Sequence, residues 1–179
     1  MRVSNPLMTY STALAKQSNR QGLLQAVAYD EASPSGLVWV ATGRGRRPGT
    51  VAGYSHPDGY YRVKFNGKMY RAHIIVWVLH HGAVPDGYEI DHRDMDKCNN
   101  LISNLRLATR AQNGANKVAR KDNKSGTKGL SWHKAGNTWM GQIKSNGVKH
   151  RVYNQCRATV EAWLIVKRQE LHGEFANNG

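Results

Sequence analysis

The segment that decides the fold runs from Glu89 to Asn113 and reads EIDHRDMDKCNNLISNLRLATRAQN. It predicts a short strand that ends near His92, a polar loop, and a second short strand through LISNLRL. The next residues read TRAQ, and Thr109 and Gln112 have the spacing of a capping box, which satisfies backbone amides at a helix start. The predicted order is therefore strand, loop, strand and helix, with Asn113 one turn inside the helix.

The side chains of this segment can support hydrolysis of a phosphodiester. Asp91 and His92 would point to opposite faces of a regular strand, so a shared site requires the strand to twist or end there. The Asp91 carboxylate and the Asn113 amide oxygen are hard ligands, suited to magnesium or manganese rather than zinc. His92 can take a proton from water near neutral pH and so act as a general base. Asn104 is predicted to pin the loop and to help orient His92.

The same residues resemble the HNH nuclease family, in the version with a ββα-metal motif found in phage and intron-encoded homing endonucleases. The resemblance rests on Asp91-His92, on Asn104 within SNLRLAT, and on Asn113. It implies Asp91 and Asn113 as ligands of one divalent ion, magnesium or manganese, with His92 as base and Asn104 as support. Zinc-preferring members carry His at the position of Asn113. The loop DMDKCNN stands where the family often has Gly, so its turn geometry is not implied.

The charge of the chain favours a polyanionic partner. Its 179 residues include 26 Lys and Arg against 12 Asp and Glu, a formal net charge of +14. From Lys97 to Val160 there are 13 basic residues and one acid, Asp122, whereas acids crowd between Asp86 and Asp96. A polyanion here means nucleic acid or an anionic membrane surface, and the segregation predicts a binding surface beside a site that uses carboxylates. An ordinary soluble basic protein is the alternative reading of the composition.

The N-terminal half is predicted to be a scaffold for this segment. We expect a loosely patterned extension over residues 1–17, a short helix near Ser18, and a strand over Leu37–Ala41. DGYYRVKFNGKMYRAH predicts a hairpin turning at Asn-Gly, followed by an apolar helix that ends at Gly82. His73, at the start of that helix, could be a ligand, but a packing role is favoured.

The C-terminal part predicts three strands, in GLSWHK, TWMGQIKS and KHRVY, and a helix over Ala158–His172. It resembles the Apetala-type DNA-binding domain, which lays a three-stranded sheet in the major groove and backs it with a helix. The sequence departs from the plant pattern at Ser131 and His133, and at Tyr153, so base preference is not implied. An ordinary α+β domain with a solvated basic face is the alternative.

Alternation along these strands assigns two faces. We expect Trp132 and Trp139 in the core against the helix. Candidate DNA contacts are the loop and outward-facing residues Arg44, Arg46, Arg47, Lys128, Ser131, His133, Gln142, Lys144, Lys149 and Arg151.

The sequence therefore predicts an α+β protein with an HNH nuclease domain over residues 18–120 and a DNA-binding domain over residues 123–179. We expect a monomeric, metal-dependent homing nickase acting on double-stranded DNA, without an obligate protein partner or a membrane. Cys98 and Cys156 suit a reducing cytoplasm, that of the host if a phage encodes the chain. A regulator that binds DNA through a remnant HNH site and a basic RNA-binding protein are the alternatives.

Overall fold

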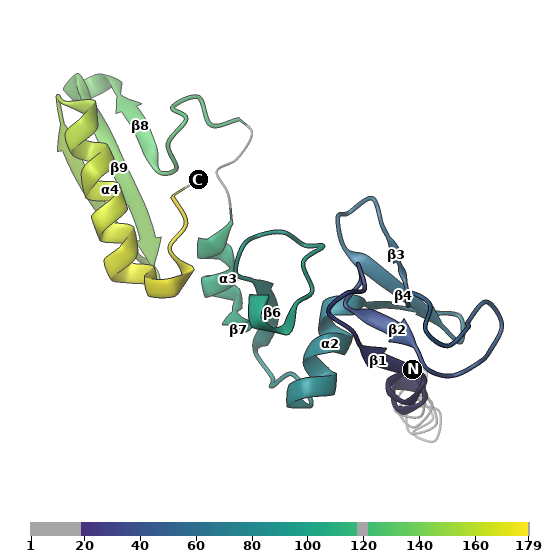
Figure 1. Cartoon of the computed structure of the whole chain (residues 1–179). Coiled ribbons are helices and arrows are strands. Elements are labelled where there is room, and N and C mark those ends of the chain that lie inside the picture. Colours follow the sequence, from purple (N-terminus) through teal and green to yellow (C-terminus); the bar gives the residue numbers. More distant parts are fainter. Residues whose placement is uncertain (1–18, 118–121, 179) are drawn as a thin grey trace, which may run out of the picture. The chain divides into compact units, whose positions relative to one another are not determined.

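The computed structural model describes residues 19–117 and 122–178 (Figure 1). It mixes helices and strands, as the predicted α+β class requires, and it divides into two compact units. The first unit combines the chain up to Asp86 with His92–Arg106, and the second combines Gly87–Asp91 with the chain from Leu107 onward. This division runs through the predicted nuclease segment, between Asp91 and His92. The predicted extension over residues 1–17 lies outside the described residues.

The first unit packs helix α2 (Ala72–His81) against two small sheets. Residues 19–26 are helical, and the antiparallel sheets have the orders β1-β2 and β3-β4-β5. The elements are β1 (Val27–Tyr29), β2 (Leu37–Trp39), β3 (Tyr54–Ser55), β4 (Tyr61–Phe65), β5 (Lys68–Arg71) and α2 (Ala72–His81). The core side chains include Leu23, Leu37, Val63 and Val76, each at most 1% exposed.

Two local signals of the sequence are found where they were predicted. The β4–β5 hairpin turns at Asn66 and Gly67, whose φ angles of 46° and 76° are the left-handed pair that an Asn-Gly turn supplies. Helix α2 ends at Gly82, which has a φ of 78° and donates its amide to the carbonyl of Val78.

The central segment follows the predicted order of strand, loop, strand and helix. Its elements are β6 (Tyr88–His92), the 3-10 turn η1 (Ile102–Asn104), β7 (Leu105–Thr109) and α3 (Arg110–Asn116). β6 and β7 pair as a two-stranded sheet. The capping box is confirmed: Gln112 donates its backbone amide to Thr109 Oγ1 at 3.3 Å, and Thr109 donates its own to Gln112 Oε1 at 2.8 Å.

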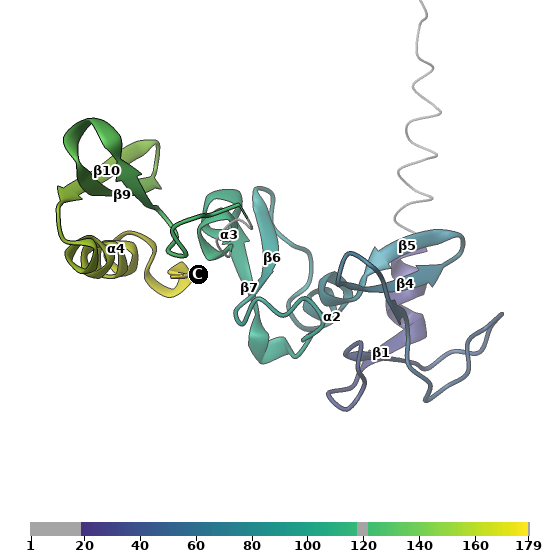
Figure 2. The same ribbon diagram turned by 90° about the horizontal axis from the view of Figure 1, so that it is seen from above.

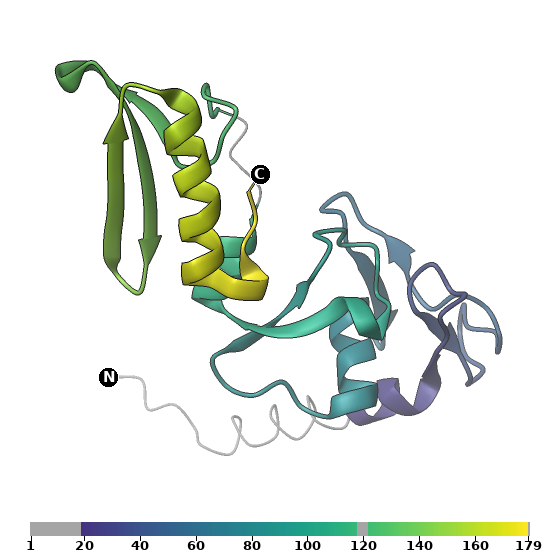
Figure 3. The ribbon, with the colours of Figure 1, turned by 60° about the vertical axis from the view of Figure 1, so that its left-hand side comes forward.

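The C-terminal part of the second unit is a sheet backed by one helix. Its elements are β8 (Leu130–His133), η2 (Lys134–Gly136), β9 (Thr138–Ser145), β10 (Val148–Asn154), α4 (Arg157–His172) and η3 (Gly173–Phe175). The strands are antiparallel in the order β10-β9-β8. Helix α4 lies along one face of this sheet (Figures 2 and 3), over a core of Leu130, Ile143, Val160 and Leu164.

One glycine and one tryptophan define how the helix meets this sheet. A Cβ at Gly141 would lie 2.8 Å from Val160 Cγ1, so the close approach of α4 depends on the missing side chain. Trp132 is 44% exposed, and the prediction that it belongs to the core is wrong. It is the register partner of Trp139, and the two rings meet edge to face at 5.2 Å. Alternation predicts the face of a strand but not how far a helix covers it.

Candidate active site

The end of β6 buries two adjacent polar side chains. Ile90, Asp91 and His92 are 8%, 7% and 5% exposed, so three consecutive residues avoid solvent. β6 ends at His92, which removes the constraint that regular alternation would impose. A buried carboxylate beside a buried imidazole is stable only where each is hydrogen-bonded.

His92 is oriented by an asparagine of the loop that follows it. His92 Nε2 lies 3.2 Å from Asn100 Oδ1, and Asn100 Nδ2 donates to the Ser35 carbonyl at 3.0 Å. Because that second bond commits the Asn100 amide nitrogen, its oxygen must face the imidazole. His92 Nε2 is therefore the donor, and the lone pair that a base uses is on Nδ1. The sequence reasoning missed Asn100, whose signal was an adjacent Asn pair in the loop.

Two further rings pack around His92. The His73 ring lies 4.9 Å from the His92 ring at 73° and 5.2 Å from the Tyr60 ring, between ring centroids. Burial lowers the pKa of His73 to about 3, and the charges of His92 and Arg71 act in the same direction. His73 is 3% exposed and packs against both rings, as the favoured packing role predicts.

Asn104 ties together the loop between β6 and β7. Its Nδ2 donates to Asp94 Oδ1 and to the Asn99 carbonyl, both at 2.9 Å, while its Oδ1 accepts from the Asp94 amide at 3.1 Å. Burial raises the pKa of Asp94, but hydrogen bonds from Asn104, Asn99 and the Asp96 amide outweigh it, and the pKa is lowered. The left-handed position of this loop is Met95, with a φ of 66°.

Asp91 is held by an asparagine of helix α3. Asn116 Nδ2 lies 3.2 Å and 3.0 Å from the two Asp91 carboxylate oxygens, and both residues are buried. Asn113, the predicted ligand, instead donates from Nδ2 to Glu89 Oε2 at 2.6 Å. The structure therefore brings Asn116 to Asp91 and sets Asn113 beside Glu89. Asn116 was missed, although its spacing of three residues from Asn113 puts both on one side of a helix.

These residues are chemically suited to a hard divalent cation. Among the described residues, His, Cys, Asp and Glu side chains form no group of three or more that could hold a metal. Asp91 with amide oxygens of α3 would leave coordination positions for water and a phosphate, as magnesium and manganese require. The Asn116 amide can present Oδ1 to a cation by a 180° turn about its last bond, because its two ends have the same shape.

The candidate DNA-binding residues lie in two places, an arginine loop of the first unit and the C-terminal sheet, and Lys128 lies apart from both. Arg46 packs its guanidinium 4.7 Å over the Phe65 ring, while Arg44 and Arg47 are exposed in the same loop. On the sheet, Lys149 of β10 lies opposite Lys144 of β9 in the strand register. Arg151 Nε donates to Gln142 Oε1 at 2.8 Å.

Ser131 is exposed, and His133 accepts the Gly136 amide at 3.2 Å. Lys128 is the exception, because its Nζ donates to the carbonyls of Ala115 and Lys117 at 2.7 Å and 2.5 Å. The ammonium of Lys128 is thus committed to backbone carbonyls within the protein.

Comparison with known proteins adds evidence from sequence similarity. The model of an HNH endonuclease family matches residues 70–115, a stretch that begins in β5 and ends in α3. Protein 3.8 of Escherichia phage T7 is 42% identical over 109 residues, which are 61% of this chain and 90% of that protein. An uncharacterized HNH endonuclease, L560 of Acanthamoeba polyphaga mimivirus, is 35% identical over 118 residues, 65% of this chain and 60% of the relative.

A homing endonuclease is a more distant relative. The DNA endonuclease I-HmuI of Bacillus phage SP01 is 34% identical over 67 residues, 35% of this chain and 38% of its own length. A solved structure, described as DNA binding and cleavage by the HNH homing endonuclease I-HmuI, aligns over 82% of this chain and 84% of that one. Its TM-score is 0.40 at 19% identity, too low to inform the fold.

These matches define a class of protein, a nuclease with an HNH motif. The chain belongs to the HNH endonuclease family and is a DNA endonuclease. The family model ends at residue 115, so the Apetala-type resemblance of the C-terminal part stays a prediction. Among the described residues, no helix combines the length and apolar character needed to cross a bilayer.

Proposed function

We propose that the chain hydrolyses a phosphodiester of double-stranded DNA with the help of one divalent metal ion, leaving 5′-phosphate and 3′-hydroxyl ends. The observation that carries this proposal is the buried Asp91-His92 pair at the end of β6. Each member is held by a different asparagine, Asn116 for the carboxylate and Asn100 for the imidazole. An asparagine partner for each side chain is the kind of support that metal ligands and general bases have.

In this mechanism His92 accepts a proton from the attacking water at Nδ1, while its Nε2–H donates to Asn100. Asp91 and one amide of α3 would hold the cation, and the cation would stabilise charge on the phosphate and the leaving oxygen. Asn113 is the amide that the family resemblance implies, and Asn116 is the amide beside Asp91 in the structure. Asn104 supports the loop that carries Asn100, through its bonds to Asp94 and Asn99.

We further propose that residues 123–179 read the DNA in the manner of an Apetala-type domain. The outward face of β9 and β10 carries Gln142, Lys144, Lys149 and Arg151, a mixture of base-reading and phosphate-binding side chains. The exposed Arg44 and Arg47 are proposed to add phosphate contacts. Binding should then weaken steeply with salt, because each phosphate contact releases counterions.

Plasmid cleavage tests the proposal. The substrate is supercoiled plasmid carrying one target site taken from the genomic flanks of the gene, incubated with limiting enzyme, with and without magnesium or manganese. Asp91-His92 and the capped helix α3 make one active site per chain, and one site should cut one strand per encounter. Open circles should therefore accumulate before linear DNA. Linear product from the first time point would contradict a monomeric nickase. Cleavage that persists in a chelator would contradict the metal.

A further inference from the structure

Helix α3 is short and needs partners at its C-terminal end. It has seven residues and includes Gly114. Isolated helices shorter than about 12–15 residues are marginal in water, and an interior glycine costs about 1 kcal/mol relative to alanine. The capping box satisfies backbone amides of the first turn. The last carbonyls of any helix, however, receive no hydrogen bond from within the helix and need donors from outside it.

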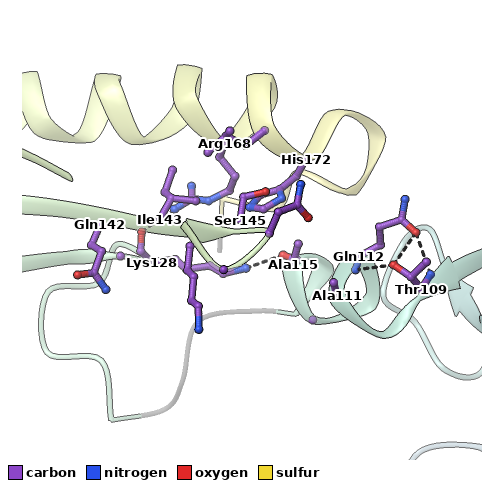
Figure 4. Close-up of a pocket in the computed structure, with 16 residues that line it drawn as sticks. Thr109, Ala111, Gln112, Ala115, Lys128, Gln142, Ile143, Ser145, Arg168 and His172 are labelled. Carbon is purple, nitrogen blue, oxygen red and sulfur yellow. Dashed lines mark hydrogen bonds between the residues drawn. The ribbon is translucent and has the colours of Figure 1, made fainter. Parts of the chain in front are cut away.

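A residue of the loop before β8 and a residue near the C-terminus supply these partners. Lys128 Nζ donates to the carbonyls of Ala115 and Lys117, as Figure 4 shows for Ala115. Asn177 Nδ2 donates to the carbonyl of Asn116 at 2.6 Å. Three successive carbonyls at the end of α3 are thus capped from outside the helix. A cation at this end also opposes the partial negative charge of the helix terminus.

The capping residues are themselves held in place. The Lys128 carbonyl accepts from Arg168 Nη2 at 2.6 Å, and Arg168 Nη1 donates to Asn178 Oδ1 at 2.5 Å. Arg168 is 3% exposed and Asn177 is 8% exposed. Burial lowers the pKa of Lys128, and the charge of Arg168 adds to this effect. A lysine that only contacted DNA would gain nothing from this partial burial.

We propose that Lys128 and Asn177 are positioning residues of the nuclease site. Asn116 links Asn177 to Asp91. Its backbone carbonyl accepts a hydrogen bond from Asn177, and its side-chain amide contacts both carboxylate oxygens of Asp91. Capping α3 therefore holds Asn116, and through it the carboxylate that binds the metal. This inference rests on the proposed function and extends it, since residues after 123 then serve the metal site as well as DNA reading.

The rival role for Lys128 is a phosphate contact, which makes the opposite prediction. Losing a phosphate contact weakens DNA binding and leaves metal affinity unchanged. Losing a helix cap weakens metal affinity even when DNA is absent. Manganese binding by the DNA-free full-length chain, followed by calorimetry, therefore separates the two roles.

The test compares Lys128→Met and Asn177→Ala with the matched control Lys124→Met. Lys124 is an exposed lysine of the same loop, so its replacement by Met removes the same charge. We expect Lys128→Met and Asn177→Ala to raise the manganese Kd and the half-saturating manganese concentration for cleavage about 10–100-fold, as loss of supporting partners does. Amide hydrogens of residues 111–117 should exchange faster in both variants, and Lys124→Met should match the wild type.

A double variant tests whether Asn177 acts through Asn116. In an Asn116→Ala background, Asn177→Ala should add little to the loss of manganese affinity, because the link to Asp91 is already broken. Full additivity would overturn the proposed route. Should Lys128→Met fail to fold, Asn177→Ala decides, and Lys128→Arg, which keeps the charge and donors, should retain near-wild-type manganese affinity.

Manganese binding by the wild-type chain distinguishes failure of the proposed function from failure of the positioning role. A wild-type chain that binds no manganese and cuts DNA without metal would overturn the proposed function. A wild-type chain that binds manganese, with Lys128→Met and Asn177→Ala binding it equally well, would overturn the positioning role alone.

Discussion

Asp91 and His92 are neighbours in the chain, but the structure holds them in different ways. His92 contacts Asn100, eight residues on, in the loop that Asn104 braces. Asp91 contacts Asn116, 25 residues on, at the end of a helix capped by Asn177, a further 61 residues along the chain. The base is therefore held by a residue of its own loop, which the Ser35 carbonyl fixes in turn, and the metal ligand by a residue of helix α3. Variants on the two sides should fail in different measurements.

The largest effect is expected for His92→Ala. Loss of a general base typically costs about 10²–10⁴-fold in rate, and the cleavage rate at saturating DNA and metal should fall by that amount. DNA affinity, measured by gel shift, and manganese affinity should stay within about twofold, because His92 is not proposed to bind either. Wild-type cleavage by this variant would remove His92 from the mechanism.

Variants of the metal side should change the metal dependence instead. Asp91→Ala should raise the half-saturating magnesium concentration for cleavage more than about tenfold. Asn113→Ala tests the second ligand: it should lose manganese affinity strongly, and recover partly in excess manganese, only if Asn113 binds the ion, because Asn116→Ala lowers the affinity in either case through its bonds to Asp91. Equal, wild-type metal dependence in all three variants would break the comparison between the two sides.

A smaller effect is expected for Asn100→Ala. This variant removes the acceptor that holds His92 Nε2–H, so the base loses its preferred tautomer and orientation. We expect a cleavage rate about tenfold lower, with a shifted pH–rate profile and an unchanged magnesium dependence. A raised magnesium requirement would show that the two sides are coupled.

A separate prediction concerns stability and pH and leaves both sides of the site intact. His73 has its pKa lowered to about 3 by burial, whereas the unfolded chain protonates histidine near its ordinary value of 6.5. Between these values the unfolded state binds more protons, so stability is full above pH 6.5 and is lost as pH falls toward 3. The limiting slope is about 1.4 kcal/mol per pH unit for one proton.

Urea denaturation between pH 7 and 4 measures this loss, and His73→Phe serves as the comparison because it cannot take up a proton. The wild type should lose more stability over this range than His73→Phe. Parallel pH dependence in the two proteins would show that His73 is not buried neutral.

Much of the fold could be predicted because its signals are local. The Asn66-Gly67 turn, the glycine that ends α2 and the Thr109–Gln112 capping box each depend on residues within one turn of each other. The order of strand, loop, strand and helix around Asp91 and His92 followed from the same kind of signal. The left-handed Met95 was not foreseen, because the family's usual glycine is missing from that loop.

By itself, the sequence determined the residue types of the site and the elements that carry them. Only the tertiary structure decided that Asn116 rather than Asn113 faces Asp91, that Asn100 holds His92, and that Lys128 caps α3. The physical reason is that a carboxylate or carbonyl can be satisfied by any nearby donor, and which donor is near depends on packing between distant segments. Periodicity and capping rules describe neighbours along the chain, and they do not contain that information.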